Sequence, residues 1–179
     1  MIIYHGSIRK FDRFTKEEVV QNLPRGIDTI GFWFSSDLDS ARPFAIGTET
    51  VIQKSETEFW EDGEPKVVQI DRPVSGFIYK VYIDEPKLKE YKSEDLFMQE
   101  RDNYCDYFSS GKRNLTWKDN ATLLNKEEAN KSFRENLMNQ GYEGLVIRDV
   151  MLHNGVTNMY CIFSGDSLYI SEVIPLDAV

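Results

Sequence analysis

The stretch Gly31-Phe32-Trp33-Phe34-Ser35-Ser36 decides the fold, because it places three aromatic side chains in succession. Side chains alternate between the two faces of a strand, so the three rings cannot all face one core. The stretch therefore predicts a strand over residues 30–35. Either this strand is buried on both faces between two sheets, or one aromatic face stays open for a flat heterocyclic ligand.

Further strands are predicted on both sides of this stretch. Their apolar runs and alternating side chains cover residues 2–5, 67–70, 76–83, 144–149, 158–163 and 169–174. In the third of these segments, Phe77, Tyr79, Val81 and Ile83 share one face. Strands and helices do not alternate regularly, so the sequence predicts an α+β domain rather than a doubly wound parallel sheet. The glycine-rich GxGxxG and GxxxxGK[ST] nucleotide motifs are absent.

Two helices are predicted over residues 93–108 and 125–140. Ser93 and Asn125 are suited to cap their first turns, and Gly141 is suited to end the second. The inward-facing positions are Leu96, Phe97, Tyr104, Cys105 and Phe108 in the first helix and Ala129, Phe133 and Leu137 in the second. Shorter helical segments are expected over residues 37–45, shortened by Pro43, and over 16–22, ended by Leu23-Pro24.

Length and composition are those of one globular domain. The chain has 179 residues, 41% of them hydrophobic and 28% charged, and no stretch approaches the roughly 20 apolar residues of a membrane span. The first residues lack the basic and apolar regions of a signal peptide, so we expect a cytoplasmic location. Cys105 and Cys161 are expected to be free thiols. Two histidines and two cysteines do not favour a zinc site.

The net charge of −9 disfavours general binding to nucleic acid, because phosphate backbones repel an acidic protein. Lys112, Arg113 and Lys126 are interpreted as exposed surface residues, and His153 as an exposed loop residue. The most polar stretch, residues 53–65, is expected to form an exposed acidic loop or hairpin tip. A docking surface for a basic partner is the alternative. Its acidic residues are Glu56, Glu58, Glu61, Asp62 and Glu64.

Two further segments contain residues suited to ligand binding or catalysis. In Tyr4-His5-Gly6-Ser7, the glycine allows close approach of a bound group and His5 can hydrogen-bond a hydroxyl. Asp149 follows the apolar strand that begins at Gly144, and a carboxylate there can stabilise a cationic transition state. The structural alternatives are a histidine that completes the core and an aspartate that opens a turn.

Taken together, three motifs resemble those of the ADP-ribosyltransferase superfamily. The first is Tyr4-His5-Gly6-Ser7, with Phe11 and Phe14 after it. The second is the aromatic stretch at residues 31–36, with Ala41, Phe44 and Ala45 after it. The third spans residues 141–149, with Tyr160-Cys161-Ile162-Phe163 after it. Their order and spacing are similar to the small branch found in phages and mobile elements, which includes polyvalent phage proteins and an anti-CRISPR enzyme. Residues 49–125 carry no motif of the family.

The resemblance implies a split β-sandwich with NAD in the cleft between the sheets. It implies that His5 bonds a ribose hydroxyl, that the Gly6 backbone holds the nicotinamide carboxamide, and that Trp33 and Phe44 replace tyrosines beside the nicotinamide. The full set of NAD-contacting positions it implies is Tyr4, His5, Gly6, Ser7, Phe32, Trp33, Ser35 and Phe44.

The chain departs from the family at the catalytic acid. The family's usual glutamate corresponds to Met159, but in the anti-CRISPR-like branch the acid is an aspartate after the third-motif strand, a position that Asp149 matches. Asp149, together with His5, is therefore the expected catalytic residue, and Glu143 is the reserve candidate.

The expected function is transfer of ADP-ribose from NAD, as substrate, to a macromolecule. Net acidity favours a protein acceptor. A phage origin, suggested by the branch alone, would fit a counter-defence or host-takeover role. The alternatives are an NAD glycohydrolase on the same fold and a non-catalytic NAD-binding module.

Overall fold

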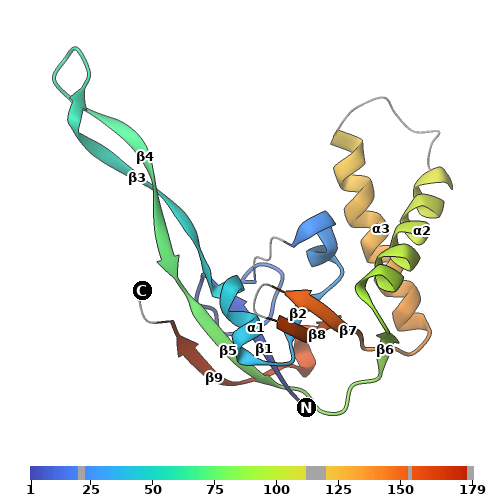
Figure 1. Ribbon diagram of the computed structural model, residues 1–179. Helices are drawn as coiled ribbons and strands as arrows, with labels where there is room; N and C mark the ends of the chain where they lie inside the picture. The colour runs from blue at the N-terminus through green and yellow to red at the C-terminus, as the bar shows by residue number, and fades with distance from the viewer. Residues whose placement is uncertain (20–22, 112–119, 153–154, 177–179) are drawn as a thin grey trace.

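The computed structural model describes residues 1–19, 23–111, 120–152 and 155–176 (Figure 1). Lys112, Arg113 and His153 lie outside the described residues, as does the side chain of Lys126. Within the described part of the chain, none of the helices is long and apolar enough to cross a membrane.

A seven-stranded sheet forms the body, in the order β6-β7-β8-β2-β1-β5-β9. Every neighbouring pair is antiparallel except β6 and β7. The strands are β1 (Ile2–Ser7), β2 (Phe32–Ser35), β5 (Phe77–Tyr82), β6 (Leu88–Tyr91), β7 (Gly144–Leu152), β8 (Gly155–Ile162) and β9 (Tyr169–Pro175). The α+β class expected from the sequence is therefore correct. These strands form one hydrogen-bonded sheet, whereas the resemblance implied a sandwich of two.

Strand β2 is buried on both faces, which is the first of the two alternatives that the aromatic stretch left open. Phe32 and Phe34 enter a cluster with Phe14 and Tyr79, and Trp33 enters a second cluster with Phe97 on the opposite face. The interpretation that β2 lies between two sheets is wrong, because helices cover the Trp33 face. The shared face predicted for residues 76–83 is confirmed, since Phe77, Tyr79, Val81 and Ile83 all pack in the Phe32 cluster, whereas Ile78 packs on the other face.

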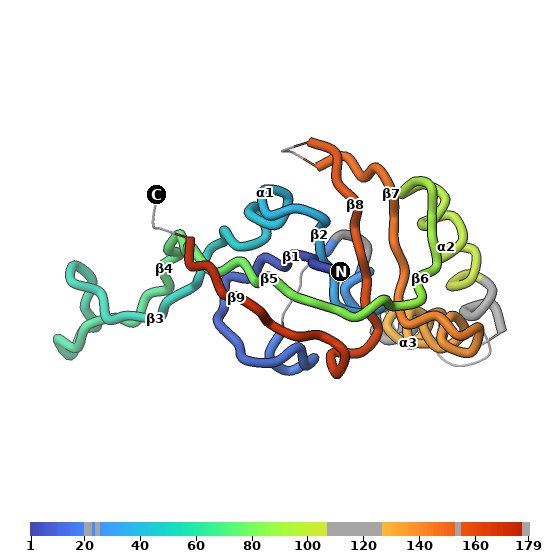
Figure 2. Tube along the Cα trace, turned by 90° about the horizontal axis from the view of Figure 1, so that it is seen from below, coloured from blue at the N-terminus to red at the C-terminus, as the bar shows by residue number. Residues whose placement is uncertain are grey.

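Helices α2 (Glu94–Gly111) and α3 (Asn120–Asn139) pack beside the β6-β7 end of the sheet (Figure 2). Ser93 caps α2, where its Oγ accepts from the Leu96 N–H at 3.4 Å, and Gly141 follows α3 with φ +84°. Asn125 is not a cap, because helical backbone begins five residues earlier at Asn120. The inward face predicted for α3 is correct, with all three positions buried.

The face predicted for α2 is partly wrong. Leu96 is 49% exposed, whereas Met98 and Arg101 are buried beside Phe97. The inward arc runs through Phe97, Arg101 and Tyr104, which lie at helical spacing on one side, and Leu96 falls outside that arc.

Short helical segments lie in the connections before and after β2 and before β9. Asp37 caps α1 (Leu38–Ala41), and Pro43 lies in the first turn of the 3-10 helix η2 (Arg42–Ala45) that follows it. A turn covers residues 16–18, where the Val19 N–H donates to the Thr15 carbonyl at 3.0 Å, and residues 20–22 of the expected helical turn lie outside the described residues. Pro24 begins the 3-10 helix η1 (Pro24–Thr29), as a proline at the first helical position can. A third 3-10 turn, η3, covers Gly165–Ser167.

Strands β3 (Ile46–Phe59) and β4 (Pro65–Ser75) form a separate two-stranded sheet that projects from the body (Figure 1). We name this hairpin, residues 46–75, the arm. The prediction of an exposed acidic hairpin tip is confirmed, but β3 was missed and β4 is longer than predicted. Both faces of most of the arm meet solvent, so its side chains do not show the alternation that reveals a half-buried strand.

Candidate functional site

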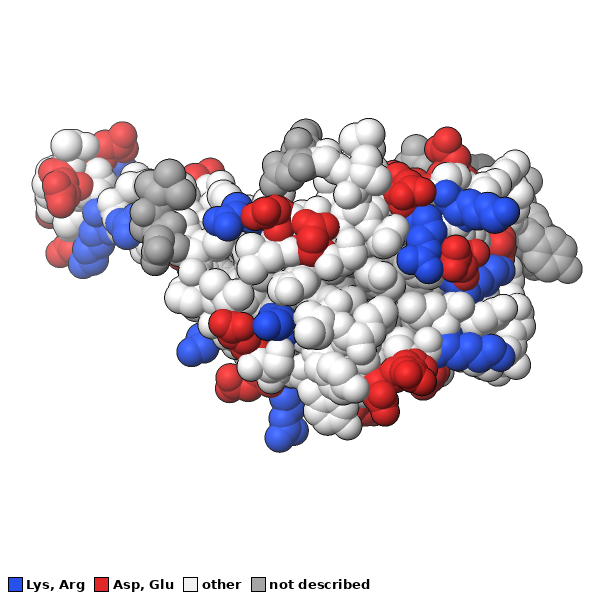
Figure 3. Space-filling model, turned by 60° about the horizontal axis from the view of Figure 1, so that its bottom comes forward, with Lys and Arg blue, Asp and Glu red and all other residues white. Residues whose placement is uncertain are grey.

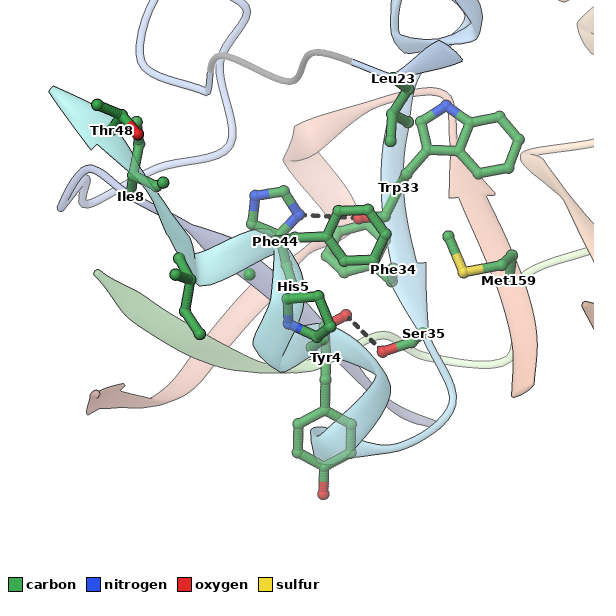
Figure 4. Close-up of a pocket in the computed structure, with 15 residues that line it drawn as sticks. Tyr4, His5, Ile8, Leu23, Trp33, Phe34, Ser35, Phe44, Thr48 and Met159 are labelled. Carbon is green, nitrogen blue, oxygen red and sulfur yellow. Dashed lines mark hydrogen bonds between the residues drawn. The ribbon is translucent and has the colours of Figure 1, made fainter. Parts of the chain in front are cut away.

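The sheet opens between β1 and β2. These two strands share one pair of register partners, Tyr4 and Ser35, whereas β1 pairs with β5 along its whole length. Beyond that pair the gap is bridged by a side chain, because the His5 ring places Nδ1 2.8 Å from the Trp33 carbonyl oxygen (Figure 4). The sheet is thus divided into halves, β6-β7-β8-β2 and β1-β5-β9, that separate at this point.

A cavity of about 360 Å³ lies at this opening, within the range of about 300–1,000 Å³ that small-molecule sites occupy. Its walls come from β1, β2, the α1–η2 segment, the first residues of the arm and one residue of β8. The lining residues are Tyr4, His5, Gly6, Ile8, Leu23, Trp33, Phe34, Ser35, Ala41, Pro43, Phe44, Ile46, Gly47, Thr48 and Met159.

Most of the residues expected to contact NAD line this one cavity. They are Tyr4, His5, Gly6, Trp33, Ser35 and Phe44. Ser7 and Phe32 do not line it. Ser7 forms a local turn with the backbone of Arg9, and Phe32 packs edge-on against Phe14 at 5.7 Å. Ser7 is therefore engaged in this turn, and Phe32 belongs to the buried aromatic cluster that also contains Phe14 and Tyr79.

His5 is almost fully buried among aromatic rings. The centroids of Phe11, Phe14 and Phe34 lie 5.8, 5.4 and 5.6 Å from its own. Burial lowers the pKa of His5 to about 4, against the smaller opposing effect of the Trp33 hydrogen bond. The ring is therefore neutral at pH 7. A carbonyl oxygen only accepts, so Nδ1 carries the proton and Nε2 keeps the lone pair.

The two expected aromatic walls differ in exposure. Trp33 is 4% exposed, its indole N–H donates to the Ile27 carbonyl at 2.9 Å, and its ring meets Phe97 edge-on at 5.8 Å. It therefore serves mainly the core beneath the helices. Phe44 is 38% exposed on η2, and Figure 4 shows its ring between His5 and Met159. Phe44 offers the freer aromatic surface for a ligand.

Gly6 is required by packing within the protein. A Cβ there would lie 2.1 Å from the Ala41 carbonyl oxygen and 2.9 Å from the Phe44 Cβ. Both contacts belong to the α1–η2 segment, which presses on β1. Glycine therefore lets η2 approach β1 closely enough to hold Phe44 over the cavity.

Asp149 lies outside the cavity lining. The prediction that it ends a strand is wrong, because β7 continues to Leu152 through a bulge between Ile147 and Val150. Asp149 occupies this bulge with φ 53°, exposed to solvent, and its N–H donates to the Asn158 Oδ1 at 3.3 Å. The extra residue of a bulge re-aims side chains, which the apolar run before it did not reveal.

The position expected for the family's glutamate does reach the cavity. Met159 is 8% exposed on β8, in register with Ser35 on one side and Ile147 on the other. No aspartate or glutamate is present among the described residues that line the cavity. The reserve candidate, Glu143, precedes β7 and accepts from the Lys87 N–H at 2.9 Å, away from the cavity.

Hydrogen bonds tie the bulged hairpin to the end of β2. Ser36 and Asn158 exchange two of them, from the Ser36 N–H to the Asn158 carbonyl at 3.0 Å and from the Asn158 N–H to the Ser36 Oγ at 3.2 Å. Thr157 donates to Asp37 at 2.7 Å. Burial opposes ionisation of Asp37, but hydrogen bonds from Thr157 and Ser40 outweigh it and lower its pKa. The backbone beside Asp149 is therefore fixed relative to β2.

The sequence did not indicate the cavity walls that come from other parts of the chain. Ile8, Leu23, Pro43 and residues 46–48 carry no chemical signal of their own. The closeness of residues 46–48 to the second motif was the one available indication. No protein-family model, curated protein or solved structure matches the chain.

Proposed function

We propose that the cavity between β1 and β2 binds NAD and that the chain transfers ADP-ribose to a protein. One observation carries the proposal. Tyr4, His5 and Gly6 from one motif and Trp33 and Ser35 from another, which the resemblance assigned to one ligand, line a single cavity with Phe44. That cavity combines aromatic surface with a few polar groups, as nucleotide and other small-molecule sites do.

The residues present fit the nicotinamide riboside half of NAD. The His5 ring, neutral at pH 7, lies on the cavity wall, and a neutral imidazole can accept a hydrogen bond from a ribose hydroxyl. Phe44 offers a ring against which the flat nicotinamide packs. The Ser35 Oγ, which donates to the Asp37 carbonyl at 2.7 Å, adds a polar group to the same wall.

The chemistry requires that the bond between the ribose C1′ and the nicotinamide nitrogen break while an acceptor side chain bonds to C1′. Nicotinamide leaves with the electron pair, and the acceptor gives up its proton. A carboxylate stabilises the positive charge that develops on the ribose and can accept that proton. Asp149 is our candidate for this group, and its bulge is held beside β8 by Asn158.

A non-catalytic NAD-binding module is the second candidate. Two observations favour it: Met159 stands on the cavity wall at the position expected for the acid, and Asp149 lies outside the lining. In that case the same cavity binds NAD without turnover. Transfer through Asp149 requires the carboxylate to approach the ribose once NAD is bound.

Labelled NAD distinguishes these functions. The full chain is incubated with NAD labelled in its adenylate half and a bacterial lysate, beside Asp149→Asn, His5→Gln and Met159→Glu. Transfer predicts a discrete labelled protein band that Asp149→Asn weakens by about 100-fold or more. Asp84→Asn, an exposed carboxylate before β6, is the matched control and should leave the band unchanged.

Other results would reassign the function. Release of nicotinamide and free ADP-ribose without a labelled band indicates a glycohydrolase. Saturable NAD binding that His5→Gln weakens, without turnover, indicates the binding module. Turnover gained by Met159→Glu in an otherwise inactive chain would support the module as a form that has lost its acid. Absence of NAD binding in the folded wild-type chain would refute the proposed site.

A further inference from the structure

The arm is independent of the core. It forms its own two-stranded sheet, and none of its residues belongs to a buried apolar cluster. Figures 1 and 2 show it extending away from the seven-stranded sheet. An isolated hairpin is at best marginally stable in water. The arm therefore adds little to the stability of the body. Its exposed side chains are candidates for binding a partner.

Large apolar side chains are exposed along the arm and at its end. Trp60 is 59% exposed and Phe59 53% exposed, and both border a hollow with Glu61, Asp62 and Lys66. Exposed tryptophan and phenylalanine side chains are common at the centres of protein interfaces. Further along one face, Ile52 and Val67 are 65% and 62% exposed and lie diagonally across the two strands.

The backbone holds this end in a defined shape. The Trp60 N–H donates to the Glu64 carbonyl at 2.7 Å, and the Gly63 N–H donates to the Trp60 carbonyl at 2.9 Å. Asp62 accepts from the Glu64 N–H at 3.1 Å, and Gly63 has φ +85°. Trp60 is thus presented on a closed turn, which lowers the entropy lost on binding.

The end of the arm is acidic, and Figure 3 shows several acidic side chains there, with a few basic ones beside them. Residues 58–66 contain four carboxylates and one lysine, a net charge of −3. Lys66 is already engaged, with its Nζ 3.6 Å from Glu58 and 5.5 Å from the Trp60 ring centre. The carboxylates Glu61, Asp62 and Glu64 remain exposed to solvent.

Charge complementarity selects the partner. A surface of lysine and arginine side chains is attracted to these carboxylates, and an arginine can also stack on the Trp60 ring. Phosphate backbones and a second copy of the same arm end are both repelled. Strand β3 runs from Thr48 at the cavity to Phe59, and a strand rises about 3.3 Å per residue. A small molecule bound at the end of the arm would therefore lie roughly 35 Å from the cavity, too far to contact it.

We propose that the end of the arm, residues 58–66, is a docking site for a partner protein with a basic surface. The base of the arm supplies Ile46, Gly47 and Thr48 to the cavity wall, so a partner of protein size bound to the arm can also face the cavity. If transfer occurs at the cavity, this partner is the acceptor, and that role rests on the proposed function. Docking itself does not depend on it.

Fluorescence anisotropy on the full chain tests the docking site. The probe is a fluorescein-labelled peptide of Arg-Leu-Lys-Ser repeats, compared with a peptide in which glutamate replaces arginine and lysine and with a labelled single-stranded oligonucleotide. Binding of the basic peptide should weaken about tenfold in Glu61→Gln/Asp62→Asn/Glu64→Gln and again in Trp60→Ala. The Asn side chain keeps the acceptor that closes the turn, so the first variant preserves the hairpin.

Asp84→Asn/Glu85→Gln is the matched control, because these exposed carboxylates lie at the opposite end of β5 from the arm. It should leave the affinity for the basic peptide unchanged. Equal loss in this control, no binding of the basic peptide, preferential binding of the oligonucleotide, or dimerisation that Trp60→Ala abolishes in sedimentation would each overturn the proposal. None of these readouts requires NAD, so failure of the transfer reaction would leave the result intact.

Discussion

The stability of the folded chain should depend on pH through the buried His5 ring, which lies beside the opening between β1 and β2. Its pKa is about 4 in the folded chain and 6.5 for an unperturbed histidine. Between these values the unfolded chain binds a proton that the folded chain excludes. Stability from this group is therefore complete above about pH 6.5 and falls by about 3 kcal/mol as the pH drops to about 4. Urea unfolding across this range measures the loss, and His5→Gln should flatten that part of the profile.

At Asp149, the role of the carboxylate can be tested separately from the role of the backbone conformation. Its φ of 53° is a conformation that Asn adopts readily and β-branched residues resist. Asp149→Asn should therefore leave the midpoint of thermal unfolding unchanged while it abolishes transfer. Asp149→Val should cost about 1–2 kcal/mol through strain in the bulge. If Asp149→Asn destabilises as much as Asp149→Val, its effect on activity says nothing about a catalytic carboxylate.

At the scale of elements, the approach of η2 to β1 shapes the cavity. Gly6→Ala would place a methyl group 2.1 Å from the Ala41 carbonyl oxygen, so one of the two elements must move. We expect a loss of about 3 kcal/mol in the free energy of unfolding and weaker NAD binding, because Phe44 would shift with η2. Ser7→Ala, which removes only a local turn with Arg9, is the comparison and should cost about 1 kcal/mol or less.

The buried side-chain amide of Asn130 joins three elements, α3, α2 and η1. Asn130 on α3 accepts from the Arg101 Nε of α2 at 2.9 Å and donates to the Gly26 carbonyl and the Thr29 Oγ of η1 at 2.9 and 2.8 Å. Asn130→Ala should lower the free energy of unfolding by about 2–4 kcal/mol, because it leaves buried polar groups without these hydrogen bonds. Lys131→Ala, an exposed neighbour, should change it by about 0.5 kcal/mol or less in the same urea titration.

At the scale of the whole molecule, the arm and the body should separate cleanly. Glu49 and Arg72 are register partners, so an Asn-Gly turn between them can replace residues 50–71. We expect the shortened chain to unfold at nearly the same temperature and to bind NAD as before, but to lose the basic peptide. Calorimetry and anisotropy measure both properties, and a large drop in unfolding temperature would show that the arm supports the body.

Much of the fold was predictable from local pattern. The alternation in β5, the inward face of α3 and the aromatic run of β2 each follow from residues close together in the chain, because strand and helix periods depend on local geometry. Leu96 was wrongly placed in the core and the buried Arg101 was missed, because burial on α2 depends on what covers each face. The long β3 was missed because the arm has no core against which a pattern could form.

The features of the candidate site also divide into those that the sequence indicated and those that only the tertiary structure decided. Residue types alone indicated Tyr4-His5-Gly6 and the aromatic run that contains Trp33, whereas Ser35 and Phe44 were indicated by the family resemblance. Only the tertiary structure decided that they share a cavity, that Gly6 is required by η2, and that Asp149 lies in a bulge outside the lining while Met159 lies within it. The physical reason is register: the extra residue in β7 and the separation of β1 from β2 depend on pairing between distant strands.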